Sequence, residues 1–183
     1  MPRVFPIALL TMVIASSAAA QKFGSAENLA PYIPTPQIVV ERMLELAHVQ
    51  ASDVVYDLGS GDGRIVITAT QKFGARAVGV EIQPDLCRKA RQRIKELGLE
   101  DRVTMIEDSA LRVDLSPATV VTMFFLTASN ERLKPNLEKY LKPGTRVVSN
   151  EFPIRGWKPV EMLVLKTGST EHRIYVYEIG RLR

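Results

Sequence analysis

The chain has 183 residues, of which 46% are hydrophobic and 24% are charged, a balance typical of one globular domain and not of a disordered chain. A formal net charge of +4 is too small to require a nucleic-acid partner, and none is expected. The single cysteine, Cys87, excludes an intrachain disulfide, and the two histidines lie far apart in the sequence, so no metal site is expected.

Residues 1–20 have the features of a secretory signal. Arg3 supplies a positive start, residues 4–14 are an apolar run, and three alanines at 18–20 offer a cleavage site before Gln21. The run is shorter than the roughly 20 apolar residues that a membrane-spanning helix needs. We expect either a cleaved signal, with a periplasmic or secreted product, or an uncleaved anchor that associates with the membrane and leaves the domain cytoplasmic.

Residues 21–35 are polar and interrupted by prolines, and are expected to form an N-terminal arm before a single domain at 36–183. Apolar residues recur at helical spacing over 36–48, which predicts an amphipathic helix. Thr35 is expected to cap this helix, with Pro36 as its first residue.

Strands and helices alternate through most of the remaining chain. Helices are expected at 64–73, at 84–97 and along the stripe Leu133, Leu137 and Leu141. Strands are expected at 53–58, 77–80, 103–106, 119–126 and 146–149, and then at 160–166 and 173–179 around a short connection. The sequence therefore predicts an α/β fold, a doubly wound and mostly parallel sheet that ends in an antiparallel hairpin.

A glycine-rich loop, residues 57–64 (DLGSGDGR), separates the first expected strand from a helix. Glycines allow a tight turn and the close approach of a ligand at the carboxyl ends of the strands. A dinucleotide site requires the pattern G-x-G-x-x-G, but here the third glycine comes one residue early and Arg64 stands in the last position. The spacing therefore counts against a dinucleotide.

Carboxylates surround this loop and indicate the charge of its ligand. Asp57 and Asp62 would repel a pyrophosphate, whereas S-adenosylmethionine has a sulfonium and an ammonium group and no phosphate. Glu81 ends the second expected strand, where a carboxylate accepts hydrogen bonds from a ribose diol. Asp108 and Ser109, after the third strand, are placed to face an adenine.

The loop, Glu81 in V-G-V-E and the E-D-S segment after the third strand together resemble the class I S-adenosylmethionine-dependent methyltransferases over residues 31–183. The segments Y-x-P-T-P at 32–36 and E-I-Q-P at 81–84 resemble more narrowly the ATP synthase c-subunit lysine methyltransferase family and its prokaryotic relatives. The non-SET histone lysine methyltransferases are more distantly similar. The cofactor residues expected from the resemblance and the loop are Tyr32, Thr35, Asp57, Gly59, Ser60, Gly61, Gly63, Glu81, Ile82, Asp108 and Ser109.

Aromatic residues after the fourth strand are candidates for the wall of a methyl-acceptor pocket. These are Phe124 and Phe125, with Thr127 beside them and Tyr32 closing the pocket from the other side. A dry aromatic pocket lowers the pKa of a lysine ammonium, which has to lose its proton before it is methylated. The alternative is that both phenylalanines are ordinary core residues.

The function expected from these features is methylation of a protein lysine side chain. A small-molecule methyltransferase and a non-catalytic S-adenosylmethionine-binding module remain alternatives, the second because the cofactor is made in the cytoplasm and an exported domain would lack a supply. A dinucleotide oxidoreductase is a weaker alternative. The basic helix surface between Arg88 and Lys95 is interpreted as a solvated face rather than a nucleic-acid or lipid site.

Overall fold

The computed structural model describes residues 27–182, so the expectations for residues 1–26 lie outside the described chain. Seven strands form one sheet in the order β3-β2-β1-β4-β5-β7-β6. The strands are β1 Val54–Leu58, β2 Arg76–Glu81, β3 Val103–Glu107, β4 Val120–Met123, β5 Arg146–Asn150, β6 Glu161–Thr167 and β7 Thr170–Glu178. The helices are α1 Gln37–Leu46, α2 Arg64–Phe73, α3 Pro84–Glu96 and α4 Thr127–Tyr140.

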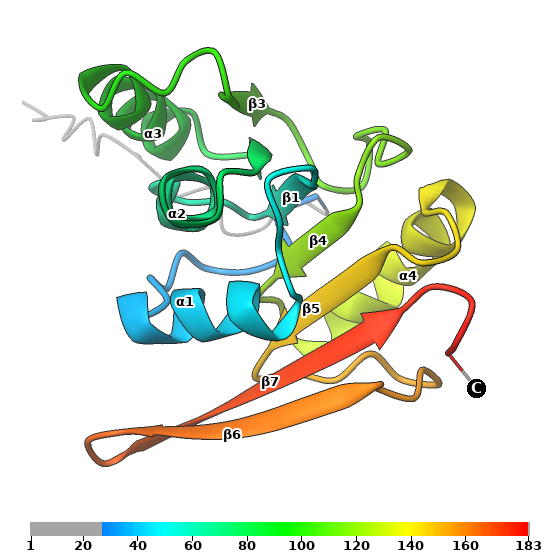
Figure 1. The fold of residues 1–183 in the computed structure, drawn as a ribbon. Helices are drawn as coiled ribbons and strands as arrows, with labels where there is room; N and C mark the ends of the chain where they lie inside the picture. The colour runs from blue at the N-terminus through cyan, green and yellow to red at the C-terminus, as the bar shows by residue number, and fades with distance from the viewer. Residues whose placement is uncertain (1–26, 183) are drawn as a thin grey trace, which may run out of the picture.

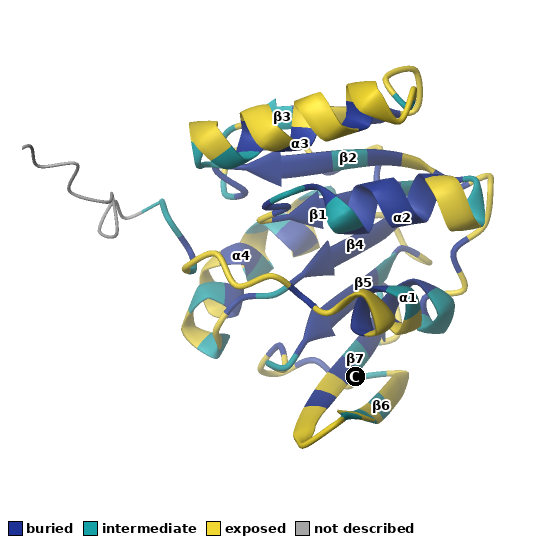
Figure 2. Cartoon of the chain, turned by 90° about the vertical axis from the view of Figure 1, so that its left-hand side faces the viewer, coloured by how far each residue is buried: buried dark blue, intermediate teal, exposed yellow. Residues whose placement is uncertain are grey.

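The helices cover both faces of the sheet (Figure 1). Apolar residues of α1, α2 and α3 form one core with one side of the strands, whereas α4 and the segment 110–118 form a second core on the opposite side. Figure 2 shows the central strands buried and the outer side of α3 exposed. This arrangement confirms the predicted doubly wound α/β fold.

The chain changes direction across the sheet between β1 and β4. The strands β1, β2 and β3 extend to one side in parallel, and the chain then crosses back so that β4 and β5 extend to the other side. Ligands of such sheets bind outside the carboxyl ends of the strands at this switch point. The topology therefore places a binding crevice beside the glycine loop that follows β1.

The predicted antiparallel hairpin is confirmed, and it is tighter than expected. β7 pairs antiparallel with both β5 and β6, and Thr167 pairs directly with Thr170, so only Gly168 and Ser169 form the turn. The two strands therefore extend beyond their predicted ends at 166 and 173, because threonines are favourable strand residues and extend the pairing. This hairpin carries residues at its tip toward the same edge as the glycine loop.

Two local expectations were wrong. α1 begins at Gln37 and Pro36 occupies the N-cap position, so Thr35 stands one residue too early to cap the helix, and no side chain caps it. The fourth strand ends at Met123 and not at residue 126, since the chain leaves the sheet to line a cavity.

Among residues 27–182 no helix is both long and apolar enough to span a membrane.

Candidate active site

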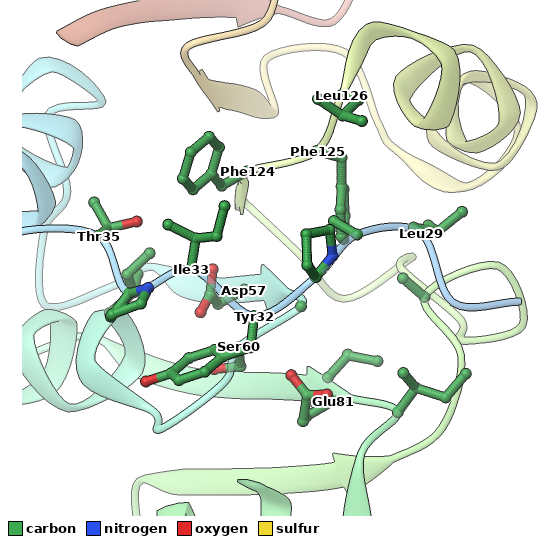
Figure 3. Close-up of a pocket in the computed structure, with 18 of the residues that line it drawn as sticks. Leu29, Tyr32, Ile33, Thr35, Asp57, Ser60, Glu81, Phe124, Phe125 and Leu126 are labelled. Carbon is green, nitrogen blue, oxygen red and sulfur yellow. The ribbon is translucent and has the colours of Figure 1, made fainter. Parts of the chain in front are cut away.

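A cavity of about 520 Å³ lies at the carboxyl edge of the sheet. Its wall is built from the ends of β1, β2, β4 and β5, from the arm at 27–35 and from the tip of the hairpin. Figure 3 shows the arm crossing in front of the glycine loop, with Asp57, Ser60 and Glu81 below it and Phe124 and Phe125 above. Segments far apart in the sequence therefore meet around one space.

The backbone of the glycine loop is held against the end of β2. The N–H groups of Gly59 and Ser60 both donate to the Val80 carbonyl at 2.9 Å, and the Gly63 N–H donates to the Ser60 carbonyl at 2.9 Å. Gly63 has a φ of 77° and immediately precedes α2. The left-handed glycine lets the chain turn from the strand into the helix without a steric penalty.

Aromatic rings cover the loop where two of its glycines lie. A β-carbon on Gly61 would stand 2.4 Å from the Tyr32 ring, and one on Gly59 would stand 2.9 Å from the Phe125 ring. Both glycines also have positive φ angles. Gly59 lines the cavity, whereas Gly61 and Gly63 lie outside its wall, so these two glycines shape the loop rather than touch the space.

Asp57 is the most buried carboxyl group of the cavity, with 2% of the residue exposed. Burial raises the pKa of Asp57 from 3.8 to about 6, and a 2.7 Å hydrogen bond from Thr122 Oγ1 opposes this shift. The negative charges of Glu81 and Asp62 raise the pKa further. A buried carboxylate of this kind is stabilised by a cationic ligand, which supplies the missing opposite charge.

Glu81 is bound through both of its carboxylate oxygens. The Gly61 N–H donates to Oε2 and the Gln83 N–H donates to Oε1, each at 2.8 Å. These bonds fix the carboxylate where it lines the cavity, with 5% of the residue exposed. Each oxygen keeps a second lone pair, so the carboxylate can still accept a pair of hydroxyl groups.

Ser60 lies beside Asp57 in the cavity wall. Its Oγ is buried and forms no hydrogen bond of good geometry among the described residues, although its interaction with the Asp57 carboxylate lowers the pKa of that group. The chemistry of the wall is therefore set mainly by the carboxylates of Asp57 and Glu81. These groups suit a nucleoside that has hydroxyl groups and positive charge.

Arg64 ties the arm to the glycine loop. Its guanidinium donates to Asp62 Oδ1 and Oδ2 at 2.9 and 2.8 Å and to the Thr35 carbonyl at 2.7 Å. Although burial raises the pKa of Asp62, the hydrogen bonds and charge of Arg64 outweigh it and hold the pKa below its usual value. From the sequence, Arg64 was only an argument against a dinucleotide site. In the structure it holds the arm in the wall of the cavity.

The remaining expected cofactor residues divide between the cavity wall and its support. Tyr32, Thr35, Ile82 and Asp108 line the cavity, and the Asp108 carboxylate also pairs with Arg112. The hydrogen bonds from Arg112 hold the pKa of Asp108 below its usual value. Ser109 is fully buried outside the wall, where its Oγ accepts from the Leu111 N–H at 3.3 Å.

The other half of the cavity is aromatic. Phe124 stacks on Phe152 with ring centroids 6.2 Å apart and an interplanar angle of 21°, and both line the cavity with Phe125. Thr127 lies outside the wall as the first residue of α4, whereas exposed Leu126 lies in the wall. Both expected phenylalanines therefore line the cavity with Asp57 and Glu81, and Phe125, 5% exposed, is also a residue of the hydrophobic core, as the alternative proposed.

Several wall residues were not predicted from the sequence. Glu151 and Phe152 follow β5, and Thr170, Glu171 and Arg173 belong to the hairpin tip. The position of Glu151 and Phe152 directly after a parallel strand is the one signal that indicates them, since such ends meet at the binding edge. The wall contains seven carboxyl residues, Glu27, Asp57, Asp62, Glu81, Asp108, Glu151 and Glu171, and two arginines, Arg64 and Arg173.

The described residues contain no group of three or more histidine, cysteine or carboxyl side chains that is arranged to hold a metal ion.

Residues 57–161 match the model of the ANTKMT methyltransferase domain. The chain is 54% identical over 151 residues to a protein-lysine N-methyltransferase of Saccharolobus islandicus, covering 82% of this chain and 94% of that protein.

Two further comparisons extend this likeness. The chain is 29% identical over 153 residues to the ATP synthase c-subunit lysine N-methyltransferase of Xenopus laevis, covering 84% of this chain but only 65% of that protein. It is 47% identical, with a TM-score of 0.75, to a crystal structure of an RNA methyltransferase from Salinibacter ruber bound to S-adenosyl-L-homocysteine. That likeness covers 80% of this chain and 94% of the other.

The fold, the acidic glycine-loop cavity and these comparisons define a class I S-adenosylmethionine-dependent methyltransferase. Within that class, the chain belongs to the ANTKMT methyltransferase domain family. The expected resemblance to the c-subunit lysine methyltransferases is confirmed, and the cofactor is S-adenosylmethionine.

Proposed function

We propose that this methyltransferase acts on lysine side chains of proteins. The observation that carries the proposal is the excess of carboxylates over arginines in the wall of one cavity, whose second half is aromatic. Such a cavity attracts a cationic side chain and offers its alkyl stem an apolar surface. The 54% identity to a protein-lysine N-methyltransferase over nearly the whole of that protein supports the same acceptor.

S-adenosylmethionine would supply, when bound, a sulfonium-activated methyl group: the acceptor nitrogen would bond to the methyl carbon as the carbon–sulfur bond breaks, so that S-adenosylhomocysteine leaves and the nitrogen releases one proton. Asp57, Ser60 and Glu81 would hold the nucleoside, since all three line the half of the cavity beside the glycine loop. The stacked pair Phe124 and Phe152 would give the acceptor half an apolar wall. The contribution of these residues is mainly the positioning of two reactants.

The surface around the cavity mouth suits a protein substrate. Tyr32, Ile33 and Leu126 line the cavity and are 40%, 59% and 52% exposed. Exposed apolar side chains beside a binding cavity are typical of a site that meets another macromolecule. A small molecule held wholly inside the cavity would leave these side chains without a partner.

RNA is the acceptor named for one structural relative, and the charge distribution disfavours it here. The buried carboxyl groups of Asp57 and Glu81 in the cavity wall would repel a phosphate backbone. The basic side of α3 does not offset them, because Arg88, Arg91 and Arg93 are paired with Asp85, Glu107 and Asp62. We therefore expect no nucleic-acid substrate.

The test has two parts that use the purified full chain. Isothermal titration with S-adenosylhomocysteine should show one site per chain, and radiolabelled S-adenosylmethionine with a cell lysate should give methyllysine after acid hydrolysis of the protein fraction. Asp57→Asn is the matched control that should lose both signals. Label confined to small molecules or to RNA would reject the lysine proposal, and binding without any transfer would favour a non-catalytic module.

A further inference from the structure

We infer that Glu151 forms the acceptor-amine subsite of the cavity and that His172 holds it in position. This inference rests on the proposed lysine acceptor and goes beyond it by assigning the residue that recognises the amine. Glu151 immediately follows β5, two strands away from Asp57 in the sheet, and belongs to the cavity wall. It therefore belongs to the half of the cavity farther from Glu81.

The carboxylate of Glu151 is held from the side of the hairpin. Oε1 lies 2.6 Å from His172 Nδ1, and Oε2 accepts from the Arg173 N–H at 3.3 Å. His172 is 9% exposed and lies outside the cavity wall, and its Nε2 lies 3.0 Å from Thr167 Oγ1. A nearly buried imidazole bonded on both nitrogens is a rigid support for the carboxylate in front of it.

The backbone at Glu151 also points to a role for its side chain. Its φ is 63°, a left-handed conformation that glycine adopts readily and that residues with a β-carbon rarely adopt. Its N–H donates to the Arg173 carbonyl at 2.6 Å, which continues the pairing of β5 with β7. A glutamate is thus kept at a position where glycine would fit the backbone better.

The surroundings of Glu151 suit an amine on an alkyl chain. The stacked rings of Phe124 and Phe152 stand in the same wall, and the nearby Arg173 guanidinium is paired with Glu171 at 2.5 Å. Because Glu171 already neutralises the Arg173 guanidinium, Glu151 keeps its attraction for a cationic ligand. A carboxylate accepts a hydrogen bond from a charged or a neutral amine, and in the neutral amine this leaves the nitrogen lone pair free.

The first experiment compares Glu151→Gln and Glu151→Gly with the wild-type full chain. The probe is a synthetic peptide with one lysine, and lysine labelling in lysate protein serves as a second substrate. We expect kcat/KM for both to fall by at least about tenfold, the loss of one charge-assisted hydrogen bond, with an unchanged Kd for S-adenosylhomocysteine. Glu151→Gly suits the backbone and keeps the test valid if Glu151→Gln folds poorly, and Glu161→Gln on exposed β6 is the matched control.

The second experiment tests His172 as a positioning residue. Asparagine retains a donor near the position of Nδ1, so His172→Asn should keep most of the activity, whereas His172→Leu should raise the KM for the peptide as Glu151→Gln does. The double variant of Glu151→Gln with His172→Leu should lose no more than Glu151→Gln alone, because the two residues act as one unit.

Three results would be decisive against this assignment. Wild-type kcat/KM in both Glu151 variants would overturn the subsite while leaving the lysine proposal intact. Loss of S-adenosylhomocysteine affinity in parallel with activity would show that Glu151 serves the fold or the cofactor and not the acceptor. Absence of methyllysine from the wild-type reaction would reject the proposed function, and the subsite with it.

Discussion

Asp57 couples the stability of the cofactor-free protein to pH. Because its native pKa is raised from 3.8 to about 6, the folded chain binds this proton more tightly than the unfolded chain does. The stabilisation is complete below about pH 3.8 and is lost as pH rises through about 6. A shift of this size corresponds to about 3 kcal/mol, as an order of magnitude, of unfavourable free energy once the carboxylate is ionised.

We predict that Asp57→Asn stabilises the cofactor-free protein at pH 7.5 by up to about 3 kcal/mol and removes the stability change between pH 4 and 7 that Asp57 causes. The Thr122 hydrogen bond can survive, since asparagine Oδ1 is also an acceptor. Urea unfolding at several pH values measures this, with Asp101→Asn, a change at an exposed site, as the control. A variant less stable than wild type at pH 7.5 would refute this electrostatic account.

The residues of the cofactor half were predictable because each carries a local signal. Asp57 and Glu81 directly end or follow strands that read as buried apolar runs, and the glycines between 59 and 63 mark the loop. Glu151 also follows a predicted strand, but its role could not be predicted, because it depends on His172 and Arg173, which follow it by about twenty residues in the sequence. Only the antiparallel pairing of β5 with β7 brings them together.

At the scale of elements, the arm packs closely on the glycine loop because Gly61 has no side chain. Gly61 has a φ of 55°, and a β-carbon there would collide with the Tyr32 ring, whereas Gly144 has a φ of 88° and nothing within 4 Å of its would-be β-carbon. We predict that Gly61→Ala and Gly144→Ala each lower the free energy of unfolding by about 1 kcal/mol, because each places a β-carbon on a left-handed backbone. Only Gly61→Ala should weaken S-adenosylhomocysteine binding, because it displaces the arm.

Calorimetric titration of both variants measures the difference in affinity for S-adenosylhomocysteine. The double variant of Gly61→Ala with Tyr32→Ala tests whether the collision with the ring is the cause. If it is, Tyr32→Ala should relieve the backbone displacement, and urea unfolding should show that part of the lost stability is recovered. Equal affinity of Gly61→Ala and Gly144→Ala for the ligand would show that the arm does not contribute to the cofactor half of the cavity.

Element boundaries were less predictable than element types. The hydrophobic periodicity indicated every helix and strand of the described chain, but it could not show where the backbone leaves the sheet. Residues 124–126 are as apolar as β4 itself, so the sequence could not separate a strand from a cavity wall. Thr35 has the side chain of a helix cap, yet its carbonyl bonds Arg64 from a distant helix, a tertiary contact that local preference does not encode.

At the scale of the whole molecule, the cavity exists because the arm is folded onto the sheet edge. Leu29 is buried in the same core as α4, Ser129 Oγ donates to the Leu29 carbonyl at 2.5 Å, and Arg64 binds the Thr35 carbonyl. The arm is thus anchored at both ends, by α4 and by α2. Any processing of the N-terminus has to leave residues 27–35 in place for the site to remain complete.

We propose that residues 1–20 are an export signal removed before Gln21, because Arg3, the apolar run and the alanines at 18–20 have the order of such a signal. Cleavage there keeps the whole arm, so the released chain should bind S-adenosylhomocysteine as tightly as the full chain. Intact mass and N-terminal sequencing of the expressed protein measure the start, which should be Gln21. Ala18→Leu should block cleavage and Ala19→Leu should not, since the first and third positions of the small-x-small site need small residues. A membrane-bound wild-type chain that begins at Met1 would instead establish an anchor. In that case the domain would stay in the cytoplasm, where its cofactor is made.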